Sequence, residues 1–334
     1  MRFPAARTGE YTVPEGTKNI GYYAFSCGNL SKITLSGGIE SIGSSAFENC
    51  SLLKSITLPD SLKRIGTYAF HWSGLESIAI PDGVEFIDKS AFAGCENLKS
   101  VTLPAGLKAV PECCFEECRA LKSINLPDSL KSIDTRAFHW SGLEDIAIPN
   151  GVEFIDESAF SGCENLKSVT LPAGLKAVPE CCFESCGLLE TVVIPDAITE
   201  IGANAFDSCS ALTEINYGGT RAAWNKMQAL PTLPEQVKVY CKDEFKPMDE
   251  TGLQITTDNV LMEYNGTATD LVIPERVVRI DFRCKNNNYV KRVFIPKNLT
   301  VITGGAFEGY NSIEKFVVDA ENGNYSSENG LFVQ

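Results

Sequence analysis

The stretch LKSITLPDSLKRIGTYAF, at residues 53–70, contains the whole unit from which the fold can be deduced. Its first six residues alternate apolar and small polar side chains, which is typical of a short strand with one buried face. Pro59 ends the strand, because proline cannot donate a hydrogen bond to a sheet. The Ala69-Phe70 pair supplies a large inward-facing wedge on the far side. One unit cannot bury its apolar face alone, so it must stack against copies of itself.

Copies of this unit run along nearly the whole chain. The proline after each strand recurs every 22 or 23 residues, at positions 14, 59, 81, 104, 127, 149, 172 and 195, with Ser36 and Gly218 in the same column and Pro274 and Pro296 resuming the rhythm. A fixed period of this length indicates a solenoid. We predict an α/β repeat solenoid of leucine-rich repeats of 22–23 residues, with one short parallel strand per coil and an irregular or short-helical convex side. About a dozen coils, at roughly 4.8 Å each, would extend about 50–60 Å.

The sequence also contains a second, longer repeat that spans several of these units. Residues 58–118 and 126–186 match at an offset of 68 with eight differences in 61 positions, such as Tyr68 against Arg136. The offset equals three coils, which indicates a recent tandem duplication. A solenoid tolerates such an insertion because each coil touches only its neighbours.

The 22–23-residue spacing is lost after about residue 217, and the chain is predicted to have three parts. These are a solenoid at 1–217, a degenerate repeat or insertion with an acidic linker at 218–252, and a hairpin with resumed, truncated repeats at 253–334. We expect a short helix with Trp224 and Met227 on one face, a strand at 237–241 and a linker at 242–252. Whether 218–252 separates two domains or interrupts one solenoid is left open.

The overall charge excludes several classes of partner. The chain has 29 basic and 43 acidic residues, for a net charge of -14. Binding to nucleic acid needs clustered Lys and Arg, and anionic membrane surfaces also select basic proteins. No run approaches the roughly 18 apolar residues of a membrane span. The N-terminal MRFPAARTGEYTVPEG has no signal-peptide core, so any export signal is expected upstream or not at all.

The repeat consensus resembles the BspA-like leucine-rich-repeat family of bacterial surface antigens. The resemblance rests on the Leu-Pro step, the Ala-Phe pair and the trailing Cys, and on YGGTRAAWNKM at 217–227 and FVVDAENGNYSSENGLF at 316–332. It implies a secreted or cell-surface protein that acts in adhesion or protein recognition. Both ends look cut within the repeat pattern, so we expect the chain to be part of a longer surface protein.

Thirteen cysteines form the first candidate site, and an odd number cannot all pair internally. Seven are assigned to one repeat column, where a small weak donor suits a tight turn that needs one backbone hydrogen bond: Cys27, Cys50, Cys95, Cys118, Cys163, Cys186 and Cys209. The alternatives are an inter-coil disulfide, or a metal site at Cys113, Cys114 and Cys118 with its copy at 181–186. A single coil does not offer four convergent ligands, so no metal or cofactor is predicted.

The second candidate site is the pair of FHWSGL segments, which contain the only two histidines. His71-Trp72 and His139-Trp140 lie three coils apart, in coils whose closing loop is one residue shorter. Their aromatic rings could grip a protein or a glycan. The alternative is that each Trp only fills the space left by the shortened loop.

The third candidate site is the outward face of the strands, a hydroxyl-rich band with almost no charge along its centre. The band runs through Thr34, Thr57, Ala79, Thr102, Asn125, Ala147, Thr170, Val193 and Asn216. Stacked Thr and Ser favour strand pairing, and they could also receive a protein edge or a carbohydrate. The assigned partner-binding residues are His71, Trp72, His139, Trp140, Thr57, Thr102, Asn125 and Thr170.

These residues favour a non-enzymatic, monomeric recognition or adhesion module that binds a protein or glycan. The alternative is a structural spacer that projects other parts of a larger surface protein. No catalytic or phosphate-binding motif is present, so the cysteine clusters would be the only support for an enzymatic function.

Overall fold

The computed structural model describes residues 8–227, 233, 236–242, 252–256, 259–264, 266–281, 287–303, 306–307, 309–328 and 331–333. They divide into two compact units, of which the first is Met1–Ile215 with Lys226–Lys238 and the second is Asn216–Asn225 with Val239–Gln334. The linker expected at 242–252 lies almost entirely outside the described residues. The three predicted domain ranges stay a prediction.

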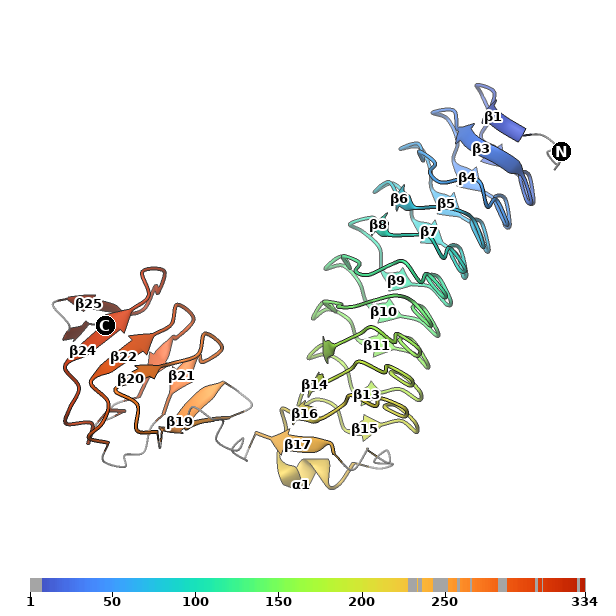
Figure 1. Ribbon diagram of the computed structural model, residues 1–334. Coiled ribbons are helices and arrows are strands. Elements are labelled where there is room, and N and C mark those ends of the chain that lie inside the picture. The colour runs from blue at the N-terminus through green and yellow to red at the C-terminus, as the bar shows by residue number, and fades with distance from the viewer. Residues whose placement is uncertain are drawn as a thin grey trace. The chain divides into compact units, whose positions relative to one another are not determined.

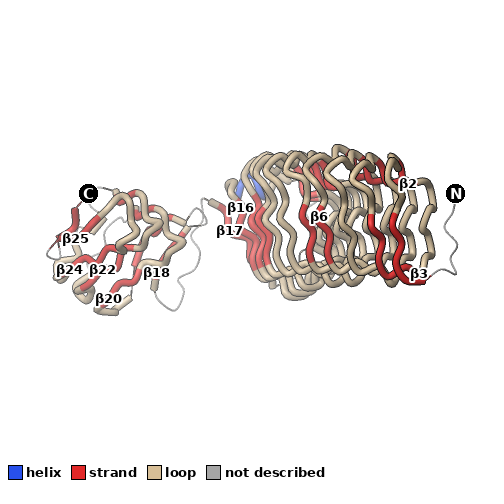
Figure 2. Tube along the Cα trace, turned by 90° about the horizontal axis from the view of Figure 1, so that it is seen from above, coloured by secondary structure: helices blue, strands red, loops and turns tan. Residues whose placement is uncertain are grey.

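The first unit is a parallel β-solenoid whose coils stack one on the next (Figures 1 and 2). One ladder starts in this unit and ends in two strands at its boundary: β1 (Thr8–Thr12), β3 (Asn29–Thr34), β6 (Ser77–Ala79), β8 (Ser100–Thr102), β12 (Ser168–Thr170), β14 (Thr191–Ile194), β16 (Glu214–Tyr217) and β17 (Lys238–Cys241). The strands from β3 to β16 have the predicted L-x-x-I-x-L pattern. The pairings of the ladder are β1-β3, β6-β8 and β12-β14-β16-β17. The leucine-rich-repeat prediction is therefore confirmed.

Each coil also contributes to a second ladder, which the sequence analysis did not predict. Its two-residue strands end at a buried Ile or Val: β2 (Asn19–Ile20), β4 (Ser41–Ile42), β5 (Arg64–Ile65), β7 (Phe86–Ile87), β9 (Ala109–Val110), β10 (Ser132–Ile133), β11 (Phe154–Ile155), β13 (Ala177–Val178) and β15 (Glu200–Ile201). They pair in register, for example Ile42 with Ile65. Two residues are too short for an alternating pattern to stand out in the sequence.

The α/β assignment and the short-helical convex side are wrong. The only helix among the described residues is α1 (Arg221–Trp224), and the convex connections are turns. Their backbone N–H groups bond alternately within the turn and to the next coil, as Ala46 N does to Gly43 O (3.2 Å) and Phe47 N to Ala69 O (2.7 Å). Ser45 and Asn49, with φ of 56°, bend each turn in the left-handed region. These conformations and inter-coil bonds replace the i→i−4 bonds that a helix needs.

Phenylalanine rings form a continuous stack through the core of the first unit. Successive rings from Phe25 to Phe206 have centroids 5.1–5.7 Å apart and lie within 14° of parallel. The predicted inward position of the Ala-Phe pair is thus confirmed. The stack passes from one copy of the duplication to the other without a break, since Phe115 and Phe138 lie 5.6 Å apart.

Two elements predicted after residue 217 are confirmed. Thr220 caps α1 by accepting a hydrogen bond from Ala223 N. Trp224 and Met227 are both buried, but the helix ends at Trp224, so Met227 lies beyond it. The expected strand at 237–241 is β17.

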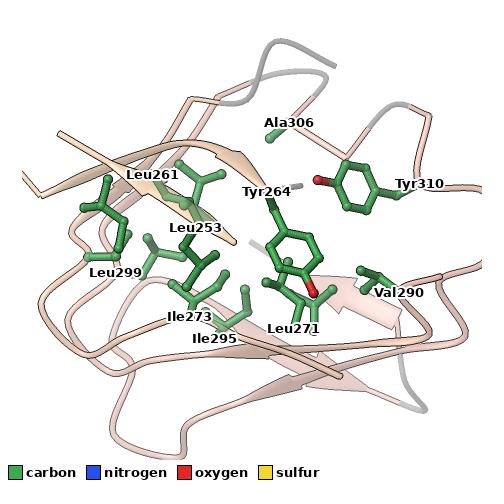
Figure 3. Packing of buried hydrophobic residues seen from close by; sticks show 14 of the residues in the cluster. Leu253, Leu261, Tyr264, Leu271, Ile273, Val290, Ile295, Leu299, Ala306 and Tyr310 are labelled. Atoms are coloured by element: carbon green, nitrogen blue, oxygen red, sulfur yellow. The ribbon is translucent and has the colours of Figure 1, made fainter. Parts of the chain in front are cut away.

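The second unit returns to the coil pattern through the predicted hairpin. β18 (Leu253–Ile255) pairs antiparallel with β19 (Val260–Tyr264), which starts a parallel ladder with β21 (Arg279–Ile280) and β23 (Val301–Ile302). The other strands are β20 (Asp270–Val272), β22 (Arg292–Ile295) and β24 (Lys315–Val318) in one sheet, with β25 (Ser326–Glu328) and β26 (Leu331–Val333) in another. Figure 3 shows part of the unit's core, in which Tyr264 and Tyr310 lie among aliphatic side chains.

Candidate functional site

The hydroxyl-rich band lies on the outward face of the first ladder, because alternate strand residues point to opposite faces. The assigned residues Thr57, Thr102, Asn125 and Thr170 are all exposed, and Val193 at the end of the band is exposed as well. Asn216 is a correction: it is only 9 % exposed and does not extend the band.

The first ladder is interrupted along this band. Residues 53–58, 121–126 and 143–148 have the strand sequence but no paired strand, and a hollow lies beside two of these segments. One hollow, of about 340 Å³, is lined by the polar side chains of Asp145, Asn150, Ser168 and Thr170. The other, of about 420 Å³, is lined by those of Lys32, Thr34, Ser55 and Thr57.

The duplicated copies differ at the first of these hollows. In the first copy β6 and β8 pair, Ile80 N donates to Thr102 O (3.0 Å), and Ala105 N donates to the Asp82 carboxylate (2.8 Å). At the same place in the second copy, no backbone hydrogen bond joins 145–148 to 168–171, all of which are described. Over residues 143–156 and 166–176, the second copy differs from the first only by Asp145 for Ser77 and Asn150 for Asp82, and both replacements line the hollow.

The His-Trp pairs lie in the turns that follow the second ladder, in a different segment of the coil. Trp72 and Trp140 both have φ of 54°, and they are 49 % and 38 % exposed. Among the described residues, no hydrogen bond, ion pair or ring contact joins these turns to the band. The structure therefore separates the assigned residues into two groups.

A glycine makes the shortened loop possible in each of these coils. A Cβ on Gly74 would lie 2.1 Å from Ser51 O, and one on Gly142 would lie 2.0 Å from Arg119 O. The shortened loop brings the glycine backbone against the preceding coil, where Gly74 N donates to Cys50 O (3.0 Å). The glycine, and not the tryptophan, fits the tightened space, because half of the Trp72 side chain remains exposed.

The two histidines have different surroundings. His71 Nδ1 lies 3.4 Å from Glu48 Oε1, within hydrogen-bond reach. His139 Nδ1 is buried without a hydrogen-bond partner. Burial lowers the pKa of His139, and the positive charge of Arg136 lowers it further.

The cysteine column is confirmed for six of its seven assigned members. Each Sγ donates to the carbonyl of the phenylalanine in the preceding coil, at 3.0–3.4 Å: Cys50, Cys95, Cys118, Cys163, Cys186 and Cys209. In the two coils with the shorter loop, Ser73 and Ser141 occupy the position of the cysteine. Each serine Oγ lies 3.3 Å from the Sγ of the cysteine in the next coil.

Cys27 is a correction, because it does not belong to this column. It is exposed with φ of 56°, one position before Gly28. Gly28 N donates to Phe25 O as Cys50 N does to Phe47 O, so Gly28 is the member of the column. The spacing from Phe25 to Cys27 is two residues, whereas the other members follow their phenylalanine by three.

The two cysteine clusters combine buried and partly buried thiols: Cys113 and Cys181 are partly buried, and the others are buried. Cys114 is buried, as predicted, and burial raises its pKa well above the usual value. Burial, together with Glu116, raises the pKa of Cys113 to about 12. The described cysteines are free thiols, and no group of three or more His, Cys, Asp or Glu side chains in the described part of the chain could hold a metal.

Comparison with known proteins identifies the family. The model of the BspA type leucine rich repeat region matches residues 18–144, 131–222 and 254–332, in six copies. The chain belongs to this BspA-type family. No curated protein matches the sequence of this BspA-type chain.

Two solved structures show the same fold. A leucine-rich repeat protein from Bacteroides ovatus is 28% identical, with a TM-score of 0.60, over 92% of this BspA-type chain and 78% of that one. A leucine rich cell surface protein from Faecalibacterium prausnitzii is 26% identical, with a TM-score of 0.51, over 93% of this chain and 88% of that one. No described helix is long and apolar enough to cross a membrane.

The BspA-type coils also expose two aromatic residues that the sequence analysis missed. Phe86 and Phe154 are 55 % and 65 % exposed, at equivalent positions of the second ladder. Arg64 lies over the Phe86 ring at 5.5 Å and also pairs with Asp88. Ser132 replaces this arginine beside Phe154. The missed signal is the segment VEFI, in which a phenylalanine precedes a buried isoleucine by one residue and so points outward.

Proposed function

We propose that this BspA-type chain is a non-enzymatic recognition module of a bacterial cell surface. Its partner is a protein or a glycan, bound by the band through Thr57, Thr102, Asn125 and Thr170. The observation that supports this most is the band itself, which is an exposed row of small side chains on a stacked scaffold, beside two hollows lined by both polar and apolar residues. Stacked repeats commonly present extended binding surfaces of this kind.

The charge and the site chemistry agree with this proposal. A net charge of -14 disfavours nucleic acid and anionic membranes as partners. The titratable groups most enclosed in the coils are thiols, and burial raises their pKa, so they are held in the unreactive protonated form. The proposed surface location follows that of the similar leucine rich cell surface protein from Faecalibacterium prausnitzii.

A binding screen tests the proposal. The purified chain is presented to extracellular-matrix proteins, mucins and glycans at physiological salt, and we expect saturable binding to one class. Changing Thr57, Thr102 and Thr170 together to Glu should weaken that binding at least tenfold, because carboxylates would crowd and charge the band. The matched control changes Ser41 and Ser132, on the second ladder, to Glu and should leave binding unchanged. Equal binding by both variants would refute the band as the site.

A structural spacer is the second candidate function. The duplication supports it, because the phenylalanine stack crosses from one copy to the other with normal spacing, so added coils lengthen the solenoid without disturbing it. The spacer function predicts that a folded chain binds none of the screened partners. Saturable binding that depends on surface residues would argue against it.

A further inference from the structure

Trp72 presents an aromatic face that is fixed in place. Its left-handed φ of 54° sets the side chain at the outside of the turn, and 49 % of it is exposed. One face of the indole lies directly on Gly94 of the next coil, where an added Cβ would come within 2.8 Å of both Cδ1 and Nε1. The exposed area therefore belongs to the opposite face of the indole, because the Gly94 backbone covers the first face.

One polar group that can bind hydroxyls lies at the edge of this ring, and two more lie beside that group. The His71 ring meets the Trp72 ring edge-on, with centroids 5.9 Å apart. Glu48 Oε1 lies 3.4 Å from His71 Nδ1. The Tyr68 ring lies 5.1 Å from the His71 ring and is 40 % exposed, which leaves its hydroxyl available.

This combination fits a sugar ring better than a protein side chain. A pyranose has an apolar face of C–H groups, which are attracted to the negative face of an aromatic ring, and a rim of hydroxyls that need hydrogen-bond partners. A tryptophan that anchors a protein interface sits instead among apolar contacts that exclude water. Glu48 is the charged group beside His71, and the chain carries a net charge of -14, so a neutral sugar is favoured over an acidic one.

The duplicated turn provides an internal contrast. At Trp140, the guanidinium carbon of Arg119 lies 5.6 Å from the ring centroid, and Glu96 and Glu117 hold that arginine at 3.6 and 3.5 Å. The residue equivalent to Arg119, 68 positions earlier in the chain, is Ser51. The guanidinium thus covers the aromatic face that is open at Trp72.

The hydrogen-bonding groups beside Trp140 differ as well. Arg136 replaces Tyr68, and His139 Nδ1 is buried without a partner. The second turn therefore lacks the phenol and the histidine-carboxylate pair of the first.

We propose that Trp72 is the stacking platform of a binding site for a neutral pyranose, with Glu48, Tyr68 and His71 at its rim, and that Arg119 closes the corresponding face of Trp140. The proposal rests on the recognition function proposed above and assigns a ligand class to one of its two groups of residues. It predicts one sugar site per chain in this pair of turns.

The test uses the full chain and a panel of neutral oligosaccharides built from glucose, galactose, mannose or N-acetylglucosamine, with sialylated and sulfated counterparts. Binding is followed by isothermal titration and by saturation-transfer NMR. We expect at least one neutral oligosaccharide to bind with a stoichiometry of one, and its acidic counterpart to bind more weakly. Trp72→Ala should weaken binding at least tenfold, while Trp72→Phe keeps part of it. Trp140→Ala is the matched control and should bind normally.

A gain of binding sharpens the test. Arg119→Ala uncovers Trp140 and should raise the saturation transferred from the protein to the sugar, because it adds a second and weaker site. Circular dichroism of each variant checks that the coils stay intact. A preference for the acidic sugars, or no binding of any neutral oligosaccharide, would overturn the assignment of ligand class. Normal sugar binding by the Trp72→Ala variant would overturn the site and leave the recognition function standing, whereas a folded chain that binds neither glycans nor proteins would refute both.

Discussion

The two copies of the duplicated segment, residues 58–118 and 126–186, have the same core and different surfaces. Their eight differences include no leucine, isoleucine, phenylalanine or cysteine. Accordingly Trp72 and Trp140 share a φ of 54°, and Cys113 and Cys181 share one of 53°. The core residues therefore determine the path of each coil.

The surface differences change what each copy can bind. Asp145 and Asn150 line a hollow where the first copy has a paired sheet. Arg119, in the coil that precedes Trp140, covers a tryptophan whose equivalent in the first copy is open, and Arg136 replaces Tyr68. A few replacements on one scaffold are thus enough to produce two different surfaces, because neighbouring coils hold the backbone in place.

The largest effect is expected from the core, and it should be equal in the two copies. Phe115 and Phe183 are equivalent and fully buried in the stack. Changing either to Ala should lower the free energy of unfolding by about 3–5 kcal/mol, since each removes a buried ring and leaves a cavity. Denaturant titration followed by circular dichroism measures the loss, with the exposed Phe154→Ala as the control. A difference between the two variants larger than about 1 kcal/mol would contradict the view that the copies share one core.

The buried thiols should make stability fall at high pH in both copies. Burial raises the pKa of Cys95 to about 11 and that of the equivalent Cys163 to about 12. The unfolded thiols lose their protons near pH 8.5, so the folded state binds more protons above that pH. The stabilising contribution is complete below about pH 8.5 and is lost as the pH rises through the folded values.

Denaturant titrations at pH 7, 9 and 10 measure this loss, and Cys95→Ser with Cys163→Ser should reduce the pH dependence. Ser73 already occupies the same column, so serine fits there. Cys27→Ser is the control, since Cys27 is exposed. An unchanged pH dependence in the double variant would show that other groups cause it.

The hollow beside Asp145 should close when the second copy is given the residues of the first. Asp145→Ser with Asn150→Asp restores the carboxylate that in the first copy accepts from the amide of the next coil. Each regained hydrogen bond should contribute about 0.5–1.5 kcal/mol. Amide hydrogen exchange should then become slower in residues 168–173.

The reverse pair, Ser77→Asp with Asp82→Asn, should speed amide exchange in residues 100–105. If neither pair of substitutions changes the exchange rates, the pairing of the strands depends on something other than these two positions.

The smallest effect is expected at the histidines. Burial and then Arg136 lower the pKa of His139, so its stabilising contribution is present above the unfolded pKa near 6.5 and is lost as the pH falls through the lower folded value. Arg136→Tyr gives this copy the residue of the first and should raise the pKa of His139 in an NMR titration. Arg119→Ser is the control, because Arg119 is not among the groups that shift this pKa. A pKa of His139 that is unmoved by Arg136→Tyr would show that burial alone lowers it.

The sequence predicts the coil, the core and most of the thiol column because these depend on periodic residues. The proline step, the Ala-Phe pair and the cysteines recur at a constant spacing, and a stack of coils turns constant spacing into contact. The exception, Cys27, comes from a spacing shorter by one residue. The helical convex side was wrong because two left-handed residues per turn, such as Ser45 and Asn49, are not glycines and give no signal in the sequence.

The candidate sites were predictable only in part. Periodicity places Thr57 and Thr170 on an exposed face, but it does not show that the sheet opens beside them. The sequence also presents His71-Trp72 and His139-Trp140 as equals, although their surroundings differ.

What the sequence by itself determined is the family, the repeat and the buried column of each coil, since hydrophobic periodicity follows from the residue order alone. Only the tertiary structure decided which strands pair, that Gly94 supports the Trp72 ring, and that Arg119 covers Trp140. These contacts join residues about one coil apart in the chain. Stacking makes them neighbours, and the geometry of the stack, not the spacing in the sequence, decides whether a given pair meets.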